Sequence, residues 1–562
     1  MEHMDTEATQ GLQLRGHFTR RQIVGAGLAI PAIAVVLAAC GDDEKDTKTT
    51  EPAGGETTVS GDTAPAPETT TPAPETTTGS GATGGTIRVA TTKPASPLDP
   101  IAMVDLGTYN VIAQTLEYLA GPEGDDIGPM LATEWSANAD STEWTFTLRE
   151  GVKWHDGSDF TADDVVATLD RIATDGDGLG GSIAAGDSTA TDALTVTIKL
   201  AASNASLPYL LSMYNPQAAI TPASFASGST LDATPAGTGP WMMDSYDPNI
   251  GIMWKRNDAY WGGAPALEVL DMQFFSDLAA QVTAMSGGSV DAIQQFSVVG
   301  GDALLNDDNF NVVEVQSTTH RQIWMGLDEG QFTDKKVRQA LALGIDRDEL
   351  VQTLFAGKAA VANDHVIFDL YAFHDPSAVE QRVRDTDAAK ALLAEAGFPD
   401  GIKATLNAVD LQEIPQLAEL LQLQLADAGF DLTLNVESDS TFYGTQWCIT
   451  YPCAGSAELG IVDYGHRPVP DVYLVKAFRG GGDWNSSQYA SAEMDAAIIE
   501  YQSSAELEAR TAACTKIEKI MWEDVPAAIA YRYNGLGGFS KSFVGVEFTA
   551  LGHTLFGKAA QA

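Results

Sequence analysis

Two neighbouring stretches of the chain repeat the same order of secondary-structure signals, and this order restricts the fold more than any other feature. Residues 385–409 read DTDAAKALLAEAGFPDGIKATLNAV, and residues 414–436 read IPQLAELLQLQLADAGFDLTLNV. In each stretch a helical pattern ends at a glycine, Gly397 or Gly429, and a strand pattern follows. Regular alternation of helix and strand is typical of an α/β fold. The sequence therefore predicts an α/β architecture for this part of the chain.

Residues 141–172, STEWTFTLREGVKWHDGSDFTADDVVATLDRI, predict a strand, a turn and a helix. Trp144, Phe146 and Leu148 alternate with polar residues, as in a half-buried strand. Thr161 is expected to cap the helix, and two aspartates follow in its first turn, where the helix dipole favours negative charge. The His-Asp-Gly turn connects the predicted strand to the predicted helix, and this structural role is sufficient to explain it without a catalytic site.

A long helix is predicted near the C-terminus. Ser503 and Glu506 are expected to open it as a capping pair, and it should end before Pro526. Cys514 would lie on this helix at helical spacing from Leu507, as a small buried apolar residue. The segment AAIAYRY that follows predicts one strand.

The first 39 residues predict a signal peptide. The adjacent Arg20 and Arg21 precede an apolar segment that is too short and too rich in Gly and Ala for a membrane-spanning helix. The arginine pair resembles a twin-arginine export signal. Leu37-Ala38-Ala39-Cys40 resembles a bacterial lipobox, in which the cysteine is acylated and becomes the first mature residue. We expect lipidation of Cys40; the alternative is an ordinary secretion signal with a chance cysteine.

Residues 40–84 predict a disordered linker, because Thr, Pro, Glu, Gly and Ala dominate the segment and no apolar periodicity occurs. Such a semi-stiff spacer would hold a folded body away from the membrane. The body that follows is too long for one simple core, so we expect two or more domains.

Composition and motifs exclude several classes of function. A formal net charge of −45 argues against nucleic-acid binding, which depends on Lys and Arg. The sequence contains no Gly-x-Ser-x-Gly elbow and no His-Glu-x-x-His segment. DGDGLGG, residues 175–181, lacks the ligands of a calcium loop and is expected to be a flexible loop. We therefore expect no catalytic residue, no cofactor and no metal.

Two of the four cysteines, Cys448 and Cys453, lie in the segment WCITYPCAG. Outside the cytoplasm a local disulfide between them is the favoured interpretation. The rival interpretation is a metal-binding pair, but no second pair and no suitable histidines accompany it.

Four stretches together resemble the extracytoplasmic solute-binding proteins that supply peptide-type ABC importers (bacterial solute-binding protein family 5, the dipeptide- and oligopeptide-binding lipoproteins). The resemblance covers nearly all of the chain after the linker. It rests on the order and spacing of these stretches, which are residues 131–166, 237–263, 332–351 and 388–401.

The resemblance implies a two-lobed α/β fold of the periplasmic-binding-protein type (type II, large peptide-binder class), with a hinge between the lobes. The first lobe would comprise residues 85–322 and 535–562, with an extra subdomain at about 122–235. The second lobe would span residues 323–534. Two crossings of the chain between lobes suit a hinged closure around a ligand.

The resemblance also implies a site. In peptide binders of this family an Asp-Tyr-like pair captures the α-amino group of the ligand, and Asp463-Tyr464 matches that position here. A carboxylate that meets an ammonium group forms a charge-assisted bond, which would select a free N-terminus.

The segment departs from the family pattern in two ways. Ile461 and Val462 stand where a Trp usually precedes the Asp. His466 and Arg467 follow, and their charge could favour an anionic group instead. The alternative to a ligand site is a surface acidic loop.

Three aromatic residues, Tyr109, Trp324 and Trp447, are secondary candidates for ligand binding. Aromatic walls suit clefts that accept varied side chains. The alternative for each is an ordinary place in the core.

We thus expect a monomeric lipoprotein of an ABC import system, anchored by lipid to the outer face of the cytoplasmic membrane. It would capture a small peptide between its lobes and deliver it to a membrane permease. An oligosaccharide, an opine-like compound or a nickel chelate remains an alternative ligand. A secreted hydrolase and a purely structural surface protein are the alternatives from other classes.

Overall fold

The computed structural model describes residues 84–562, apart from residues 104, 125, 177 and 449–452. The predicted signal peptide, Cys40 and the predicted linker up to residue 83 lie outside the described residues. Within the described part of the chain, no helix is long and apolar enough to cross a bilayer.

The first large sheet has seven strands and mixed directions. β1 lies in its centre, parallel to both β10 and β11, and a strand from near the C-terminus, β20, joins it between β11 and β12. The order across the sheet is β12 (Phe310–Val315), β20 (Gly535–Ser540), β11 (Ala292–Phe296), β1 (Thr86–Thr92), β10 (Val269–Phe275), β9 (Gly251–Arg256) and β8 (Trp241–Asp247).

The second large sheet contains the repeated helix–strand units. β15 is parallel to β16 and to β17, and β17 is antiparallel to β13. The order is β14 (Ala359–Val361), β19 (Tyr531–Tyr533), β13 (His320–Met325), β17 (Leu459–Tyr464), β15 (Ile402–Val409) and β16 (Phe430–Glu437), with β18 (Ala527–Ala528) also on β13.

A separate four-stranded sheet lies within the region predicted as an extra subdomain. Its order is β4 (Ala132–Ala137), β5 (Glu143–Leu148), β7 (Thr195–Lys199) and β6 (Ser188–Asp192). Three short hairpins complete the strands: β2 (Ala120–Glu123) with β3 (Asp126–Pro129), β21 (Phe543–Val544) with β24 (Ala560–Gln561), and β22 (Glu547–Phe548) with β23 (Thr554–Leu555).

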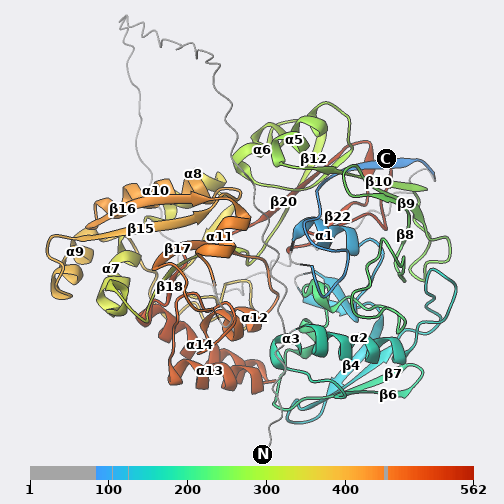
Figure 1. Ribbon diagram of the computed structural model, residues 1–562, viewed down its shortest axis with the longest axis horizontal. Helices are drawn as coiled ribbons and strands as arrows, with labels where there is room; N and C mark the ends of the chain where they lie inside the picture. Colours follow the sequence, from blue (N-terminus) through green and yellow to red (C-terminus); the bar gives the residue numbers. More distant parts are fainter. Residues whose placement is uncertain (1–83, 104, 125, 177, 449–452) are drawn as a thin grey trace, which may run out of the picture. The chain divides into compact units, whose positions relative to one another are not determined.

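Helices separate many of these strands along the chain (Figure 1). Before the second large sheet they are α1 (Leu106–Ile112), α2 (Ala162–Asp175), α3 (Gly178–Gly181), α4 (Leu207–Leu210), η1 (Pro216–Ala218), α5 (Leu278–Ser286) and α6 (Val298–Leu305). The later ones are η2 (Gln331–Thr333), α7 (Lys335–Gly344), α8 (Arg347–Phe355), α9 (Thr386–Glu395), α10 (Ile414–Ala426), α11 (Asp439–Thr445), α12 (Asp471–Tyr473), η3 (Leu474–Phe478), α13 (Ala492–Ser503) and α14 (Leu507–Asp524).

The repeated helix–strand plan is confirmed. α9 precedes β15 and α10 precedes β16, and α10 lies along these two parallel strands (Figure 1). Both predicted stop glycines, Gly397 and Gly429, have positive φ angles of 94° and 98°. A residue with a Cβ would be strained there, so glycine lets the chain leave each helix and turn into the next strand.

The chain passes between the two large sheets twice. The segment after β12 leads from the first sheet into β13 of the second, and the short link after β19 returns the chain to β20 of the first. His320 already belongs to the second sheet, three residues before the boundary expected from the sequence. The connection around Thr318 is therefore the first crossing.

The sequence predictions near the C-terminus were partly wrong. Ser503 is the last residue of α13, and α14 starts at Leu507 after Glu506, which makes no side-chain capping bond. Cys514 is buried as expected, but Leu507 is largely exposed. A helix that ends only a few residues before the next one places capping residues at both ends, and the sequence pattern did not separate the two ends.

Two shorter segments also differ from expectation. AAIAYRY forms two strands, β18 and β19, because the backbone N–H of Ile529 between them donates to Asp364 instead of to a strand. DGDGLGG, expected to be a flexible loop, contains the end of α2 and the short turn α3, in which Leu179 is buried.

A buried cluster of charges ties several parts of the second sheet together. Asp364 is fully buried and accepts hydrogen bonds from Arg347, at 2.9 and 2.7 Å, and from Arg382, at 2.7 Å. The backbone N–H of Ile529 adds a bond of 3.0 Å. The two guanidinium groups share one carboxylate, so its loss would leave buried positive charge without compensation.

We predict that Asp364→Asn lowers the free energy of unfolding by about 3–5 kcal/mol, because two buried guanidinium groups lose their negative partner. Asparagine tolerates the positive φ of residue 364, so the backbone should not add strain. Chemical denaturation measures the change.

The matched control is Asp431→Asn. Asp431 also pairs with a cation, Lys403, at 2.8 Å, but both side chains are exposed. Its loss should cost less than about 1 kcal/mol. Equal effects of the two substitutions would contradict the assigned role of the buried cluster.

Candidate ligand-binding site

Asp463 lies on β17, in the middle of the second large sheet, and its carboxylate is only partly buried. One of its oxygens accepts a hydrogen bond from the hydroxyl of Tyr443, at 2.5 Å. The negative charge of Asp463 raises the pKa of the Tyr443 phenol further, after the larger effect of burial. Among the described residues no cation forms an ion pair with Asp463, so its charge is available to a ligand.

The cationic strand neighbour of Asp463, Arg321, lies within electrostatic reach of it but forms no ion pair with it. Arg321 is opposite Asp463 in the register of β13 and β17. Its guanidinium instead donates to Glu413, at 2.8 Å from Nε and 3.1 Å from Nη2, and to Gln412, at 2.7 Å. Arg321 and Glu413 are both almost fully buried, so this ion pair is part of the framework beneath the site.

Tyr464, predicted to act with Asp463, lies in the core. Successive side chains of a strand point to opposite faces, so the two residues cannot share one site face. Tyr464 is buried, donates to the carbonyl oxygen of Trp484 at 3.3 Å, and stacks on His320 with ring centroids 5.5 Å apart.

Tyr109 lies on α1, the helix that follows β1 of the first large sheet. Asp105 caps this helix by accepting a hydrogen bond from the backbone N–H of Thr108. Burial raises the pKa of Tyr109, Arg467 lowers it, and Asp105 and Asp463 raise it. The phenol therefore lies within electrostatic reach of both Asp463 and Arg467. The structure thus brings together residues 109 and 463, which are far apart in the sequence.

The two predicted tryptophans differ. Trp324 is almost fully buried, donates to the carbonyl oxygen of Ala457 at 2.8 Å and packs edge-on against Phe442, so it is a core residue here. Trp447 is half-buried and packs edge-on against Tyr443, the partner of Asp463, with centroids 5.4 Å apart. Trp447 is therefore beside the candidate site, whereas Trp324 belongs to the hydrophobic core of the second sheet.

Cys448 and Cys453 are joined by a disulfide. The residues between them lie outside the described part of the chain. The disulfide directly follows Trp447, so it closes a small loop next to the aromatic residue that borders Asp463.

The segment after Asp463 is held to the first crossing by Thr318. The Thr318 backbone N–H donates to Nδ1 of His466 at 3.1 Å, and its hydroxyl donates to the Arg467 carbonyl at 3.0 Å. In return the backbone N–H of Arg467 donates to the Thr318 hydroxyl at 2.9 Å. The hydroxyl of Tyr473 donates to the carbonyl of Gly465 at 2.6 Å.

The histidines around this segment are neutral. Burial, with a smaller contribution from the positive charge of Arg467, lowers the pKa of His466 to about 3 and that of His553 to about 4. His553 lies next to Tyr109, with ring centroids 6.4 Å apart. Of His466, His553 and Arg467, only Arg467 therefore carries a positive charge.

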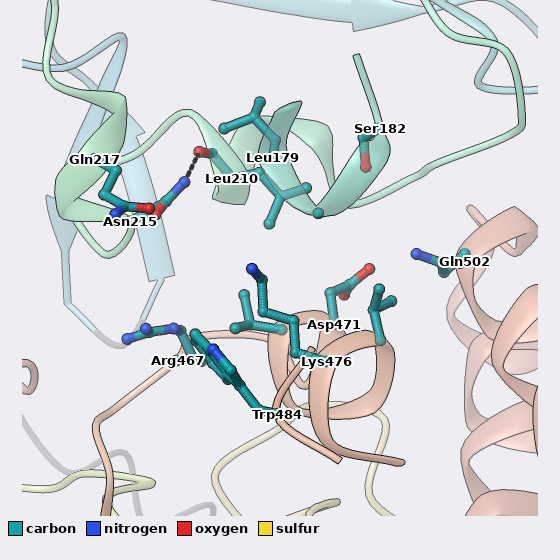
Figure 2. A pocket seen from close by; sticks show the side chains of 13 residues that line it. Leu179, Ser182, Leu210, Asn215, Gln217, Arg467, Asp471, Lys476, Trp484 and Gln502 are labelled. Carbon is teal, nitrogen blue, oxygen red and sulfur yellow. Dashed lines mark hydrogen bonds between the residues drawn. The ribbon is translucent and has the colours of Figure 1, made fainter. Parts of the chain in front are cut away.

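A small cavity of about 60 Å³ lies beside Arg467 (Figure 2). One wall comes from the subdomain region and includes Leu179, Leu210 and Asn215; the other comes from residues after β17 and includes Arg467, Val472 and Trp484. A ligand in it would contact both parts of the chain.

Sequence reasoning noted Arg467 only as a possible departure and missed Thr318 and His553. The signal for Arg467 was its place four residues after Asp463. Thr318 carries no motif, and only the crossing of the chain shows its role. Among the described residues, no group of three or more His, Cys, Asp and Glu side chains is placed to hold a metal ion.

Comparison with known sequences identifies the family of this chain. The sequence pattern of the family described as bacterial extracellular solute-binding proteins, family 5 Middle, matches residues 126–485. The chain belongs to this family. Its two large sheets, linked by two crossings, form the two-lobed fold of these solute-binding proteins.

Individual relatives are distant. Heme-binding protein A of Haemophilus influenzae is 24% identical over 453 residues, covering 74% of this chain and 81% of that protein. The dipeptide-binding protein of Escherichia coli is 26% identical over 336 residues, covering 54% of this chain and 62% of that protein. The solved structure of the oligopeptide-binding protein AppA of Bacillus subtilis, in complex with a nonapeptide, has a TM-score of 0.72 at 20% identity and covers 86% of this chain and all of that one.

The buried histidines predict a loss of stability in acid. A histidine whose folded pKa lies below its unfolded value contributes full stability above about pH 6.5 and loses it as the pH falls toward the folded pKa. For His466 and His553 the window is therefore from about pH 6.5 down to the folded values of about 3 and about 4. At pH 5 each should have lost about 2 kcal/mol.

We predict that His466→Gln and His553→Gln each reduce the loss of unfolding free energy between pH 7 and pH 5 by about 2 kcal/mol. Denaturation of wild type and variants at both pH values measures this. Each variant is compared with itself, so the cost of the substitution at pH 7 cancels. A loss equal to that of wild type would show that the histidine is not held neutral.

Proposed function

We propose that this solute-binding protein is the receptor of an ABC import system, and that it captures a small peptide through an ammonium group at Asp463. One observation carries the proposal: Asp463 is a partly buried carboxylate with a fixed orientation and no cationic partner among the described residues. An ammonium group would complete its charge and form a charge-assisted hydrogen bond. Tyr443 and Trp447 supply an aromatic border for the rest of the ligand.

The two crossings of the chain support binding by closure. We assign residues 85–319 and 535–562 to one lobe, with an extra subdomain at about 122–235, and residues 320–534 to the other; the boundary expected from the sequence, at residue 323, is moved because His320 pairs within the second sheet. The solute would bind between the lobes, and a higher affinity for the closed state would drive the closure. The closed complex would then deliver the solute to a membrane permease, with no chemistry on the solute.

Lipidation of Cys40 is part of the same proposal. A receptor that serves a permease gains from a high local concentration at the membrane, which a lipid anchor and a linker provide. The receptor would act as a monomer on the outer face of the cytoplasmic membrane.

The names of the relatives differ in ligand, since one is a heme-binding protein and another a dipeptide-binding protein. We favour a peptide because a lone carboxylate beside aromatic side chains suits an amine-bearing solute better than an uncharged sugar.

We predict that Asp463→Asn weakens binding of short peptides with a free N-terminus by roughly 10- to 100-fold, because the charge-assisted bond is lost. N-acetylated forms of the same peptides should bind poorly to wild type and variant alike. Mass spectrometry of peptides retained from a mixed di- and tripeptide library identifies a ligand, and calorimetry then measures its dissociation constant.

The control is Asp431→Asn, an exposed aspartate of the same sheet, which should bind as wild type does. Equal binding of free and N-acetylated peptides by wild type would contradict amine capture at Asp463. Retention of sugars or chelates in place of peptides would support the receptor function but contradict the peptide ligand.

A further inference from the structure

The two lobes also meet through residues that are not part of the Asp463 site. The backbone N–H of Ala205, in the proposed subdomain, donates to the carbonyl oxygen of Gln502 on α13 at 2.8 Å. Next to it, Nη2 of Arg510 on α14 donates to the hydroxyl of Ser206, which is 304 residues away in the sequence. Both bonds join residues that we assign to different lobes, so they exist only while the lobes are together.

Apolar side chains interlock across the same boundary. Tyr209 of the subdomain packs against the hydrophobic core around the second sheet, and Val472 of the second lobe packs against the core of the first. The rings of Tyr214 and His466 meet edge-on, with centroids 5.1 Å apart. Gln502 lies at the edge of this contact, beside the cavity (Figure 2). The two hydrogen bonds are therefore part of a packed contact between the lobes.

Arg510 is held in place by groups of the second lobe alone. Its guanidinium lies over the rings of Tyr501, at 4.7 Å, and Phe373, at 5.4 Å. Asp471 lies within electrostatic reach, and its carboxylate accepts a hydrogen bond from Tyr501 at 2.7 Å. These groups surround Arg510 whether or not the lobes meet, so most of the cost of burying its charge does not depend on closure. What closure adds is the hydroxyl of Ser206.

The acceptor is fixed in the same way within the first lobe. Ser206 is fully buried, and its backbone N–H donates to the side chain of Asn204 at 2.8 Å. The carbonyl oxygen of Asn204 accepts a hydrogen bond at 3.1 Å from Trp144 of β5, in the four-stranded sheet. Donor and acceptor are thus already in position when the lobes meet. A bond between preorganised groups loses little conformational entropy and keeps more of its free energy.

We propose that Arg510 and Ser206 form a latch between the lobes, which favours the closed state without contacting the solute. The proposal rests on the proposed function, since it concerns the closure that would enclose the solute. When the binding-competent state is only partly populated, the affinity falls by that fraction. The latch therefore raises the affinity for every solute by one common factor, whereas Asp463 selects among solutes. Arg510 is a positioning residue of the receptor.

The test measures opening of the full chain without any solute. The backbone N–H of Ala205 donates across the lobes, so its hydrogen exchange reports their separation. The N–H of Met213 donates to Ala120 within the first lobe, at 3.0 Å, and reports local unfolding of the subdomain. Mass spectrometry measures the exchange of both in wild type, Arg510→Met and Ser206→Ala. The thermal transition of each variant checks its fold.

Ser206→Ala tests the latch even where Arg510→Met does not fold. It removes only the acceptor, and α4 loses no cap because the Ser206 side chain makes no capping bond. The matched control is Lys516→Met. Lys516 lies on the same helix as Arg510 and pairs with Glu500 at 2.6 Å, but both side chains are exposed and belong to the second lobe. This control should open as wild type does.

We expect the Ala205 amide to exchange about 10-fold faster in Arg510→Met and in Ser206→Ala than in wild type, as loss of a hydrogen bond to a charged group implies. Exchange of the Met213 amide should not change. Solutes that wild type retains should bind both variants about 10-fold more weakly, and the ratio of dissociation constants between solutes should stay the same.

Unchanged or slower exchange of Ala205 in the folded variants would overturn the latch and leave the receptor function intact. An equal acceleration at Met213 would assign the effect to unfolding of the subdomain and would also overturn it. So would a changed order of preference among solutes, because Arg510 would then act on the ligand. Retention of no solute by wild type would instead overturn the proposed receptor, and exchange without solute would still decide the latch.

Discussion

The hydrogen bonds of Thr318 are the interaction on which the site depends. Thr318 lies on the first crossing between the large sheets, and its backbone and hydroxyl bind His466 and Arg467 of the loop after β17. The loop that follows Asp463 is thereby fixed to the segment that joins the two sheets. A motion of one lobe relative to the other would pivot near this contact, so the charged groups of the site would keep their positions at the hinge.

The charged side chains of the structure differ in whether they have an ionic partner. Two buried charge clusters of the second sheet are paired: Arg321 with Glu413, and Asp364 with two arginines. Asp463 and Arg467, in contrast, have no ionic partner among the described residues. Unpaired charges are costly in a protein interior, and natural folds retain them mainly where a ligand or a reaction uses them. At Asp463 a ligand could supply the ionic partner that the described residues do not.

Local sequence patterns were sufficient for most helices and strands. The alternation of Trp144, Phe146 and Leu148 and the glycines at 397 and 429 act within one element or one turn, so neighbouring residues carry the whole signal. The pattern failed at Ser503 and at the AAIAYRY segment, where an adjacent helix and the distant Asp364 determined the outcome. Of the candidate site, Asp463 and its aromatic neighbour Trp447 were predicted, whereas Tyr464 and Trp324 lie in the core.

The sequence by itself determined the α/β alternation, the membership of the solute-binding family and which charged residues the chain contains. The tertiary structure alone decided which charges remain unpaired. Arg321 lies opposite Asp463 in the strand register and Arg467 follows it by four residues, yet Glu413, distant in the sequence, pairs with the first, and no described carboxylate pairs with the second. Ion pairing depends on distances of a few ångströms between segments that only folding brings together, and a linear sequence does not contain those distances.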